Sequence, residues 1–138
     1  MREVFIDTNV VFDLLLGIEP QASQATALFE YAILKDIVLN ICSFSYATVY
    51  YVLRKRLSHE NVLNDLDWLS NLTKCLPVNE IVIQQAMRSQ FRDFEDAIQY
   101  FCALQIPKCE AIISRDRKGF RLSAIPAMSP NEFLANEI

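Results

Sequence analysis

Four aspartates stand where side chains could do chemistry. Asp7 directly follows the apolar run VFI, Asp116 follows AIISR, and Asp93 and Asp96 lie three positions apart just before another apolar stretch. Carboxylates that meet in one place repel by roughly 4 kcal/mol at 4 Å and an effective dielectric of 20, so they either raise a pKa or hold a cation. The only histidine is His59, and no two of the four cysteines have C-x-x-C spacing. Oxygen ligands alone favour Mg²⁺ or Mn²⁺, which can activate water and neutralise a phosphodiester.

Alternating apolar strands and amphipathic helices must position these acids. The pattern predicts one three-layer α/β/α domain over residues 1–138, with a central parallel sheet of four to five strands. The expected strands are 4–6, 37–41, 75–78, 111–114 and 125–128. The expected helices are 10–16, 23–35, 45–56, one capped by Ser58, 81–90, 94–105 and 131–138. Because sites in such folds form at the carboxyl ends of the strands, Asp7, Asp96 and Asp116 are expected to meet at one rim.

Each acid also has a simpler interpretation. Asp93 could be the N-cap of the helix that follows, and Asp96 could be favoured there by the helix dipole. Asp116 could be a turn residue, and Asp13 is interpreted as a helix-surface or hydrogen-bonding group rather than a metal ligand. Asp7 is hardest to explain this way, because a carboxylate at the end of a buried strand needs partners. The chemical prediction therefore depends on their convergence.

Composition limits the class of protein. The chain has 138 residues, 52% hydrophobic and 22% charged, with a net charge of −4, so nucleic acid would have to be bound through a local basic patch or through metal ions. The longest uncharged stretch, 37–53, is 17 residues long and shorter than the ~20 that a membrane span needs. No signal peptide is apparent, and the cysteines are interpreted as reduced. A soluble cytoplasmic protein with no membrane partner is expected.

Three segments together resemble the PIN-domain family: FIDTNVVFDLLL, DFEDAIQYFCAL and AIISRDRKGF, in the same order and at similar spacing. The resemblance implies a Rossmann-like fold and a Mg²⁺- or Mn²⁺-dependent ribonuclease. Many bacterial members are toxins of VapBC-type pairs, which are commonly homodimers and are inhibited by a small antitoxin protein. It implies that Asp7, Asp96 and Asp116 bind metal and carry catalysis, with Asp93 as a further candidate ligand. Asn9 and Ser114 match positions that support these acids.

One position departs from the family pattern. Members usually carry a glutamate early in the helix after the second strand, and here Thr48 stands at that position, with no acid between Asp36 and Glu60. Threonine is a poorer, uncharged ligand, although Asp93 or Glu95 could supply the missing charge. The alternative is a PIN-like binding domain that has lost catalysis. A phosphatase with an aspartate nucleophile is disfavoured, because its second aspartate would fall at Asn9.

Two basic clusters could hold phosphates. Arg115, Arg117 and Lys118, with Arg121 nearby, surround Asp116 and are candidate RNA-binding residues, or else a solvated loop. Arg54–Arg56 are interpreted as a helix C-terminus. Tyr50, Tyr51 and Tyr100 are expected in the core or at a dimer interface, and His59 in a cap region without a catalytic partner.

Overall fold

A parallel sheet forms the centre of the molecule. The computed structural model describes residues 1–137, and in it five strands pair in the order β3-β2-β1-β4-β5, all parallel. Their bounds are β1 Glu3–Ile6, β2 Val38–Cys42, β3 Lys74–Leu76, β4 Cys109–Ile113 and β5 Ala127–Met128. The prediction of an α/β fold with a parallel sheet is confirmed.

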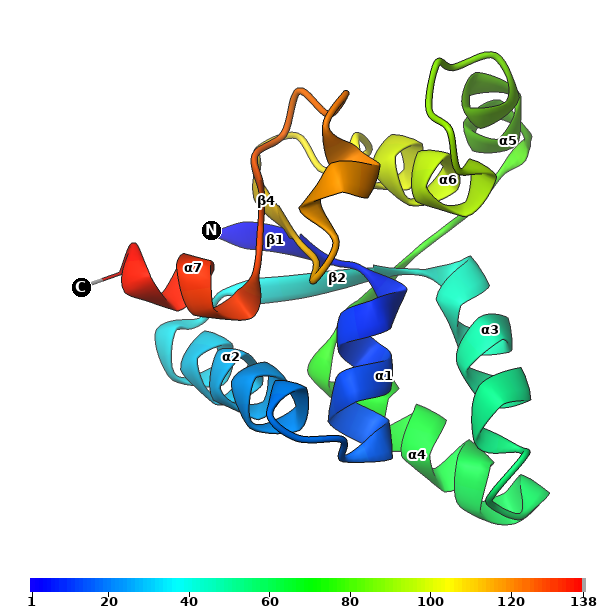
Figure 1. The fold of residues 1–138 in the computed structure, drawn as a ribbon, viewed down its shortest axis with the longest axis vertical. Coiled ribbons are helices and arrows are strands. Elements are labelled where there is room, and N and C mark those ends of the chain that lie inside the picture. The colour runs from blue at the N-terminus through cyan, green and yellow to red at the C-terminus, as the bar shows by residue number, and fades with distance from the viewer. Residues whose placement is uncertain (138) are drawn as a thin grey trace.

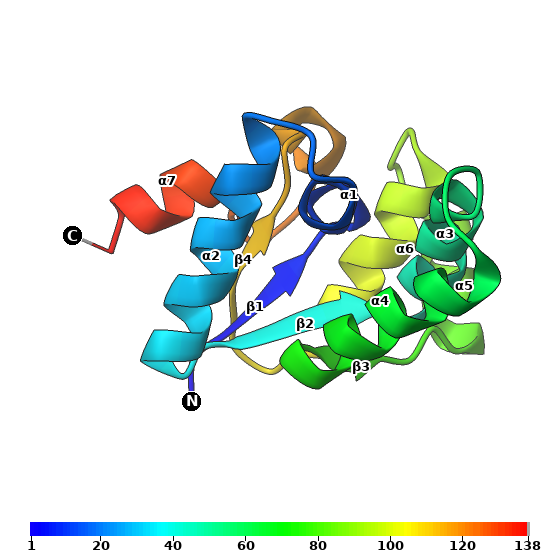
Figure 2. The same ribbon diagram turned by 90° about the horizontal axis from the view of Figure 1, so that it is seen from below.

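Helices cover both faces of this sheet, as Figures 1 and 2 show from two directions. α5 and α6 lie on one face, and α1, α2 and α7 lie on the other with the α3–α4 pair beside them. Their bounds are α1 Thr8–Leu16, α2 Gln21–Lys35, α3 Ser43–Leu53, α4 His59–Leu72, α5 Glu80–Met87, α6 Phe94–Ala103 and α7 Pro130–Ala135, with a 3₁₀ turn η1 at Arg117–Phe120. None of the helices described within residues 1–137 is long and apolar enough to span a membrane.

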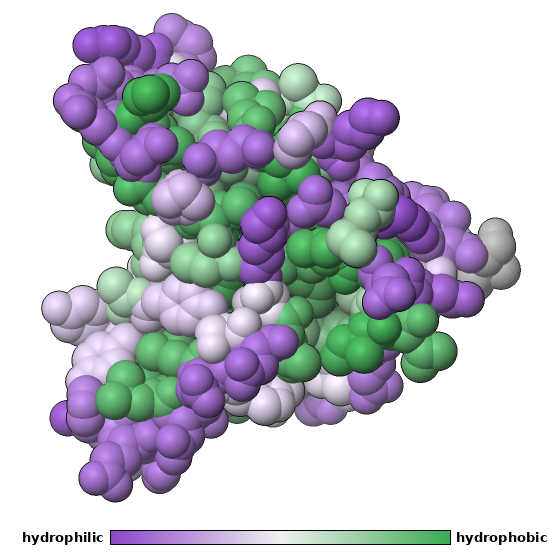
Figure 3. Space-filling model, turned by 180° about the vertical axis from the view of Figure 1, so that it is seen from behind, coloured by the Kyte–Doolittle hydropathy of each residue, from purple (hydrophilic) through white to green (hydrophobic). Residues whose placement is uncertain are grey.

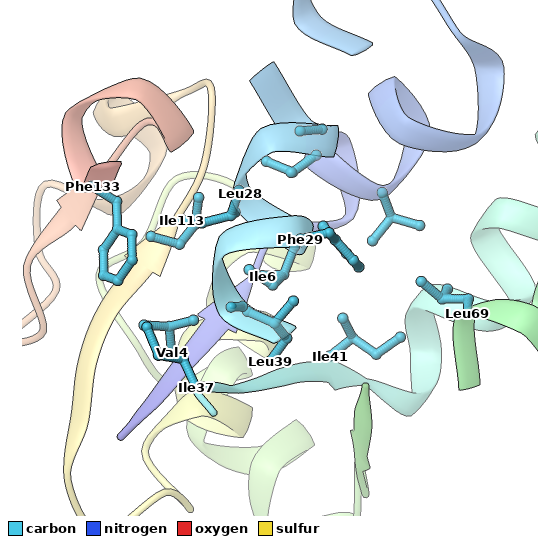
Figure 4. Close-up of a cluster of buried hydrophobic side chains, with 14 of the residues drawn as sticks. Val4, Ile6, Leu28, Phe29, Ile37, Leu39, Ile41, Leu69, Ile113 and Phe133 are labelled. Atoms are coloured by element: carbon cyan, nitrogen blue, oxygen red, sulfur yellow. The ribbon is translucent and has the colours of Figure 1, made fainter. Parts of the chain in front are cut away.

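The central strand explains why its sequence is continuously apolar. Val4 and Ile6 belong to the core beneath α1 and α2, whereas Phe5 points into the core beneath α5 and α6. All three side chains are completely buried. Figure 4 shows Val4 and Ile6 in the first core beside Leu28, Phe29, Ile113 and Phe133. β1 is thus fixed from both faces, and its carboxyl end is a rigid place for Asp7.

Several helix boundaries differ from those expected. α1 begins at Thr8, because the Asp7 side chain accepts a hydrogen bond from the Asn9 amide (3.5 Å), and it ends at Gly17 with a φ of 67°. The helix predicted over 45–56 ends at Leu53, because the next amides turn back to Val52 and Leu53 carbonyls, so Arg54–Arg56 follow it. Ser58 does cap α4. In the predicted helix 131–138, α7 accounts for residues up to Ala135, and Ile138 lies outside the described residues.

Figure 3 shows the back of the molecule in Figure 1. Hydrophilic residues gather there on the protruding parts, and apolar residues lie between them. The carboxylates described next lie instead where β1 and β4 end and α6 begins.

Candidate active site

Asp7 lies at the carboxyl end of β1 and caps α1. Its side chain is only 4% exposed. The Ser114 hydroxyl donates to Oδ2 at 2.6 Å, and the Gln99 amide Nε2 donates to Oδ1 at 2.8 Å. Burial raises the pKa of Asp7, and these hydrogen bonds oppose the rise because they stabilise the ionised form. Both carboxylate oxygens are therefore held in a fixed orientation.

A buried polar network continues behind Asp7. Gln99 Oε1 accepts from the Thr8 amide at 3.0 Å and from the Thr8 hydroxyl at 3.2 Å, and Thr8 Oγ1 lies 2.6 Å from Ser45 Oγ. These side chains are at most 3% exposed. The network connects α1, α3 and α6, so three helices fix the position of one carboxylate.

Asp96 occupies the first turn of α6 and is half-buried. Its pKa is raised to about 7, first because burial disfavours the charge and then because Asp7, Asp93, Asp116 and Glu95 repel it. Asp7 and Asp116, which the sequence places far from Asp96, are thus close enough in space to raise its pKa.

The Asp116 carboxylate lies near that of Asp96, and both border the space beside Gly119. It caps η1, where its Oδ1 accepts from the Gly119 amide at 3.4 Å. A Cβ added to Gly119 would collide with Asp96 Oδ2 and would lie 3.4 Å from Asp116 Oδ2. Gly119 therefore leaves the space into which the Asp96 and Asp116 carboxylates both point.

Asp93 and Glu95 add charge at the rim. Asp93 is exposed and is the N-cap of α6, where it accepts from the Asp96 amide at 2.9 Å. The pKa of Glu95 is raised by burial and by repulsion from Asp93 and Asp7. Asp93 thus already serves as the N-cap of α6, and Glu95 lies near enough to Asp93 and Asp7 for their charges to raise its pKa.

Ser114 and Asn9 join the two strand ends. Besides donating to Asp7, Ser114 Oγ accepts from the Asp116 amide at 3.0 Å and from Asn9 Nδ2 at 3.4 Å. Asn9 Oδ1 accepts from the Arg115 amide at 3.4 Å. One hydroxyl therefore sets the relative positions of Asp7 and Asp116.

α3 contributes no carboxylate. Thr48 Oγ1 donates to the Phe44 carbonyl at 3.4 Å, within its own helix. The α3 side chain that does reach the neighbourhood of Asp7 is Ser45, one turn earlier, through Thr8. The place that the family pattern gives to a second acid is thus served by hydroxyl groups.

The basic cluster is largely paired. Arg115 Nε lies 2.5 Å from Asp13 Oδ2, and Arg117 Nη1 lies 2.9 Å from Glu132 Oε2. Asp13 is only 8% exposed and accepts a hydrogen bond from Arg115 Nε, so the interpretation as a hydrogen-bonding group is confirmed and the alternative of a helix-surface group is wrong. Lys118 has no such ionic partner within residues 1–137.

The tyrosines have separate environments. Tyr100 is buried, and its ring stacks on Phe91 at 5.1 Å. Tyr50 is half-buried with its hydroxyl 2.8 Å from His59 Nδ1, at the start of α4, whereas Tyr51 is 73% exposed. Among these rings, Tyr51 alone is available for a partner.

The donor set suits a hard divalent cation. Asp7, Asp96 and Asp116 offer only oxygen ligands, and burial and repulsion from the neighbouring acids raise the pKa of Asp96, which a bound cation or a proton would each offset. Within residues 1–137, no three acidic, histidine or cysteine side chains form a ready-made cage. Holding a cation would thus require that these carboxylates draw together, which their mutual repulsion otherwise opposes.

Sequence reasoning missed Gln99, Thr8 and Ser45. The signal for Gln99 was present: a glutamine three positions after Asp96, on a helical face otherwise made of apolar residues. A buried amide needs partners, and the nearest unsatisfied group was Asp7.

Comparison with known proteins agrees with this architecture. The family model for the PIN domain matches residues 3–118, so the chain belongs to the PIN-domain family. None of the curated proteins matches.

Three solved structures share the fold. VapC20 of Mycobacterium tuberculosis, described as a sarcin–ricin loop cleaving toxin, is 19% identical with a TM-score of 0.66, over 84% of this chain and 92% of that one. FitAB bound to a DNA fragment contains a chain with 20% identity and a TM-score of 0.66, over 92% and 94%. A chain of VapBC2 of Rickettsia felis, bound to a fragment of promoter DNA, is 13% identical with a TM-score of 0.63, over 92% of this chain and 97% of that one.

Proposed function

We propose that this protein is a metal-dependent ribonuclease that hydrolyses phosphodiester bonds in RNA. One observation carries the proposal: Asp7, Asp96 and Asp116, from three separate segments, converge where β1 and β4 end and α6 begins. Membership of the PIN family and the fold shared with VapC20, the sarcin–ricin loop cleaving toxin, support it.

Asp7, Asp96 and Asp116 would hold Mg²⁺ or Mn²⁺, which when bound supplies an activated water and neutralises charge on the phosphate. Ser114 and Gln99 hold Asp7 in one orientation by donating to separate oxygens. Ser114 also holds the Asp116 backbone, and Asn9 holds Ser114. Because burial and the neighbouring acids raise its pKa to about 7, Asp96 would have to release a proton before it could hold a cation.

Cleavage of labelled RNA tests the proposal. Wild type should cut with Mn²⁺ or Mg²⁺ and not with chelator, and Asp7→Asn should be inactive. Asp67→Asn is a matched control, because Asp67 is exposed on α4, away from the acids. Equal cleavage by wild type and Asp7→Asn, or no cleavage in any metal, would refute the proposal.

We further propose that the protein is the toxin of a toxin–antitoxin pair and is bound by a small antitoxin as a homodimer. The support comes from relatives of the same fold, since VapBC2 and FitAB were solved as toxin–antitoxin complexes. Light scattering of the purified chain measures its molar mass, which should be twice the 15.9 kDa of one chain if it is a homodimer. Growth arrest on expression, relieved by co-expressing a small neighbouring gene, tests the toxin role.

A second candidate is a PIN-like domain that binds nucleic acid or protein without catalysis. The observation that favours it is the substitution at α3, where Thr48 bonds within its helix and only the Ser45 hydroxyl approaches. Calorimetric titration with Mn²⁺ separates the two. No binding at millimolar Mn²⁺ supports the non-catalytic domain, and binding that disappears in Asp96→Asn supports the nuclease.

A further inference from the structure

A pocket of about 520 Å³ opens beside the acidic group. Asp96 and Asp116 form one part of its lining, the cations Arg92, Lys118 and Arg121 form another, and Phe91 contributes an aromatic ring. We infer that this pocket binds the nucleotide next to the scissile phosphate of single-stranded RNA. The cations would hold its phosphate, and Phe91 would hold its base. The inference rests on the proposed ribonuclease function.

The charges indicate which cations are available. Arg115 and Arg117 are each engaged by a carboxylate, from Asp13 and Glu132. In contrast, the side chains of Arg92, Lys118 and Arg121 are exposed and make no ion pair or hydrogen bond within residues 1–137. Phosphate contacts therefore belong to these three residues. Lys118 and Arg121 belong to the cluster that the sequence indicated around Asp116, whereas Arg92 was not among the candidates taken from the sequence.

The acids and the cations of the pocket suit two neighbouring phosphates of an RNA strand in different ways. Acids suit a scissile phosphate only through a metal ion, whereas the neighbouring phosphate can be bound directly by guanidinium and ammonium groups. Lys118 directly precedes Gly119, the residue over which Asp96 and Asp116 converge. Cations and acids in one pocket thus fit two successive phosphates with different needs.

Phe91 is fixed well enough to act as a platform. Its ring stacks on buried Tyr100 at 5.1 Å and 29°, and meets Phe101 edge-on at 6.3 Å. It remains half-buried and lines the pocket. Bases stack on aromatic rings without strong sequence preference, and they are free to do so in single strands rather than in duplexes. The pocket volume lies within the ~300–1,000 Å³ usual for small-ligand sites.

Fluorescence anisotropy with labelled oligouridine in EDTA tests binding without cleavage. The variant Arg92→Ala/Arg121→Ala should bind about tenfold more weakly, and the slope of log affinity against log salt should fall by about 1.4, at ~0.7 per phosphate contact. Lys55→Ala/Arg56→Ala removes the same charge from exposed positions after α3 and is the matched control. Equal losses in both double variants, or none in either, would overturn the assignment.

A second variant tests the base contact. Phe91→Leu should weaken binding of oligouridine but not of an abasic oligonucleotide, with the salt slope unchanged and folding checked by the melting temperature. The role of Phe91 would be contradicted if Phe91→Leu bound both oligouridine and the abasic oligonucleotide more weakly. It would also be contradicted if wild type bound a duplex as tightly as oligouridine. If wild type binds RNA through Arg92 and Arg121 but cleaves none, the pocket stands and the ribonuclease fails. If the pocket variants bind and cleave RNA as wild type does, the ribonuclease function stands and the assignment of the pocket fails.

Discussion

Replacing Asp96 by asparagine should stabilise the metal-free protein, in a way that depends on pH. The carboxyl has a pKa of about 7 in the folded chain against an ordinary value of 3.8, so folding favours the protonated form. Well below its ordinary pKa of 3.8, Asp96 is neutral in both the folded and the unfolded state and does not affect stability. As the pH rises to 7 the unfolded state is ionised first, and wild type loses stability until the folded carboxyl has also ionised. Asparagine carries no charge and avoids this loss.

The size of the effect follows from the same shift. Three pKa units correspond to about 4 kcal/mol for a fully buried group. Asp96 is only half-buried, and screening by solvent reduces this to about 1–2 kcal/mol. At roughly 4 °C per kcal/mol for a domain of this size, the melting temperature of Asp96→Asn should exceed that of wild type by about 4–8 °C at pH 8. At pH 4 the difference should be near zero.

In the presence of Mn²⁺, wild type should be more stable than Asp96→Asn. A cation bound by ionised Asp96 stabilises wild type by mass action, and the variant loses that gain. Melting temperatures of both proteins from pH 4 to 8.5, in EDTA and in millimolar Mn²⁺, measure the effect, with Asp67→Asn as the control that should follow wild type throughout. A variant less stable than wild type in EDTA at pH 8, or a difference that does not change with pH, would refute the reasoning.

Three further predictions concern the same site. Gln99→Leu leaves the buried Thr8 amide without its acceptor and leaves Asp7 Oδ1 with only the long hydrogen bond from the Asn9 amide (3.5 Å), so the free energy of unfolding should fall by about 2–4 kcal/mol in denaturant titrations; Gln85→Leu, at an exposed position on α5, should have little effect. Gly119→Ala should displace the Asp96 carboxylate and reduce RNA cleavage at least tenfold while circular dichroism shows an intact fold, and full activity would contradict the role given to Gly119. Affinity for Mn²⁺ by calorimetry should rise between pH 6 and 8 as Asp96 ionises, and a flat profile would exclude Asp96 as a ligand.

The sheet could be predicted from the sequence because its central strands contain short apolar runs that are buried on both faces. Val4–Ile6 and Ala111–Ile113 are of this kind, and both are flanked by helical periodicity. Parallel pairing then places their carboxyl ends together, which explains why the proximity of Asp7 to Asp116 could be expected without coordinates. Helix ends were less predictable, since no glycine or proline marks the end of α3 in the sequence, whereas the backbone has already turned at Arg54–Arg56.

Side-chain pairing could not be predicted in the same way. Whether Arg115 faces RNA or a carboxylate depends on Asp13, which is distant in sequence and looks like an ordinary helix-surface acid. The contact arises only because α1 and the end of β4 lie side by side in the folded chain. The partnership of Gln99 with Thr8 and Asp7 has the same origin, since α6 must cross β1 at one particular register.

The substitution at Thr48 and the raised pKa of Asp96 belong to one problem. With no carboxylate from α3, the site holds fewer negative charges to bind a divalent cation, and each remaining charge matters more. Ionised Asp96 supplies one of them, yet burial and its neighbours keep its pKa near 7. If this site binds a cation as proposed, we expect its affinity for the cation to vary with pH across the neutral range. In this chain α3 contributes the Ser45 hydroxyl, which contacts Thr8 behind Asp7, and therefore adds no further negative charge to those that already raise the pKa of Asp96.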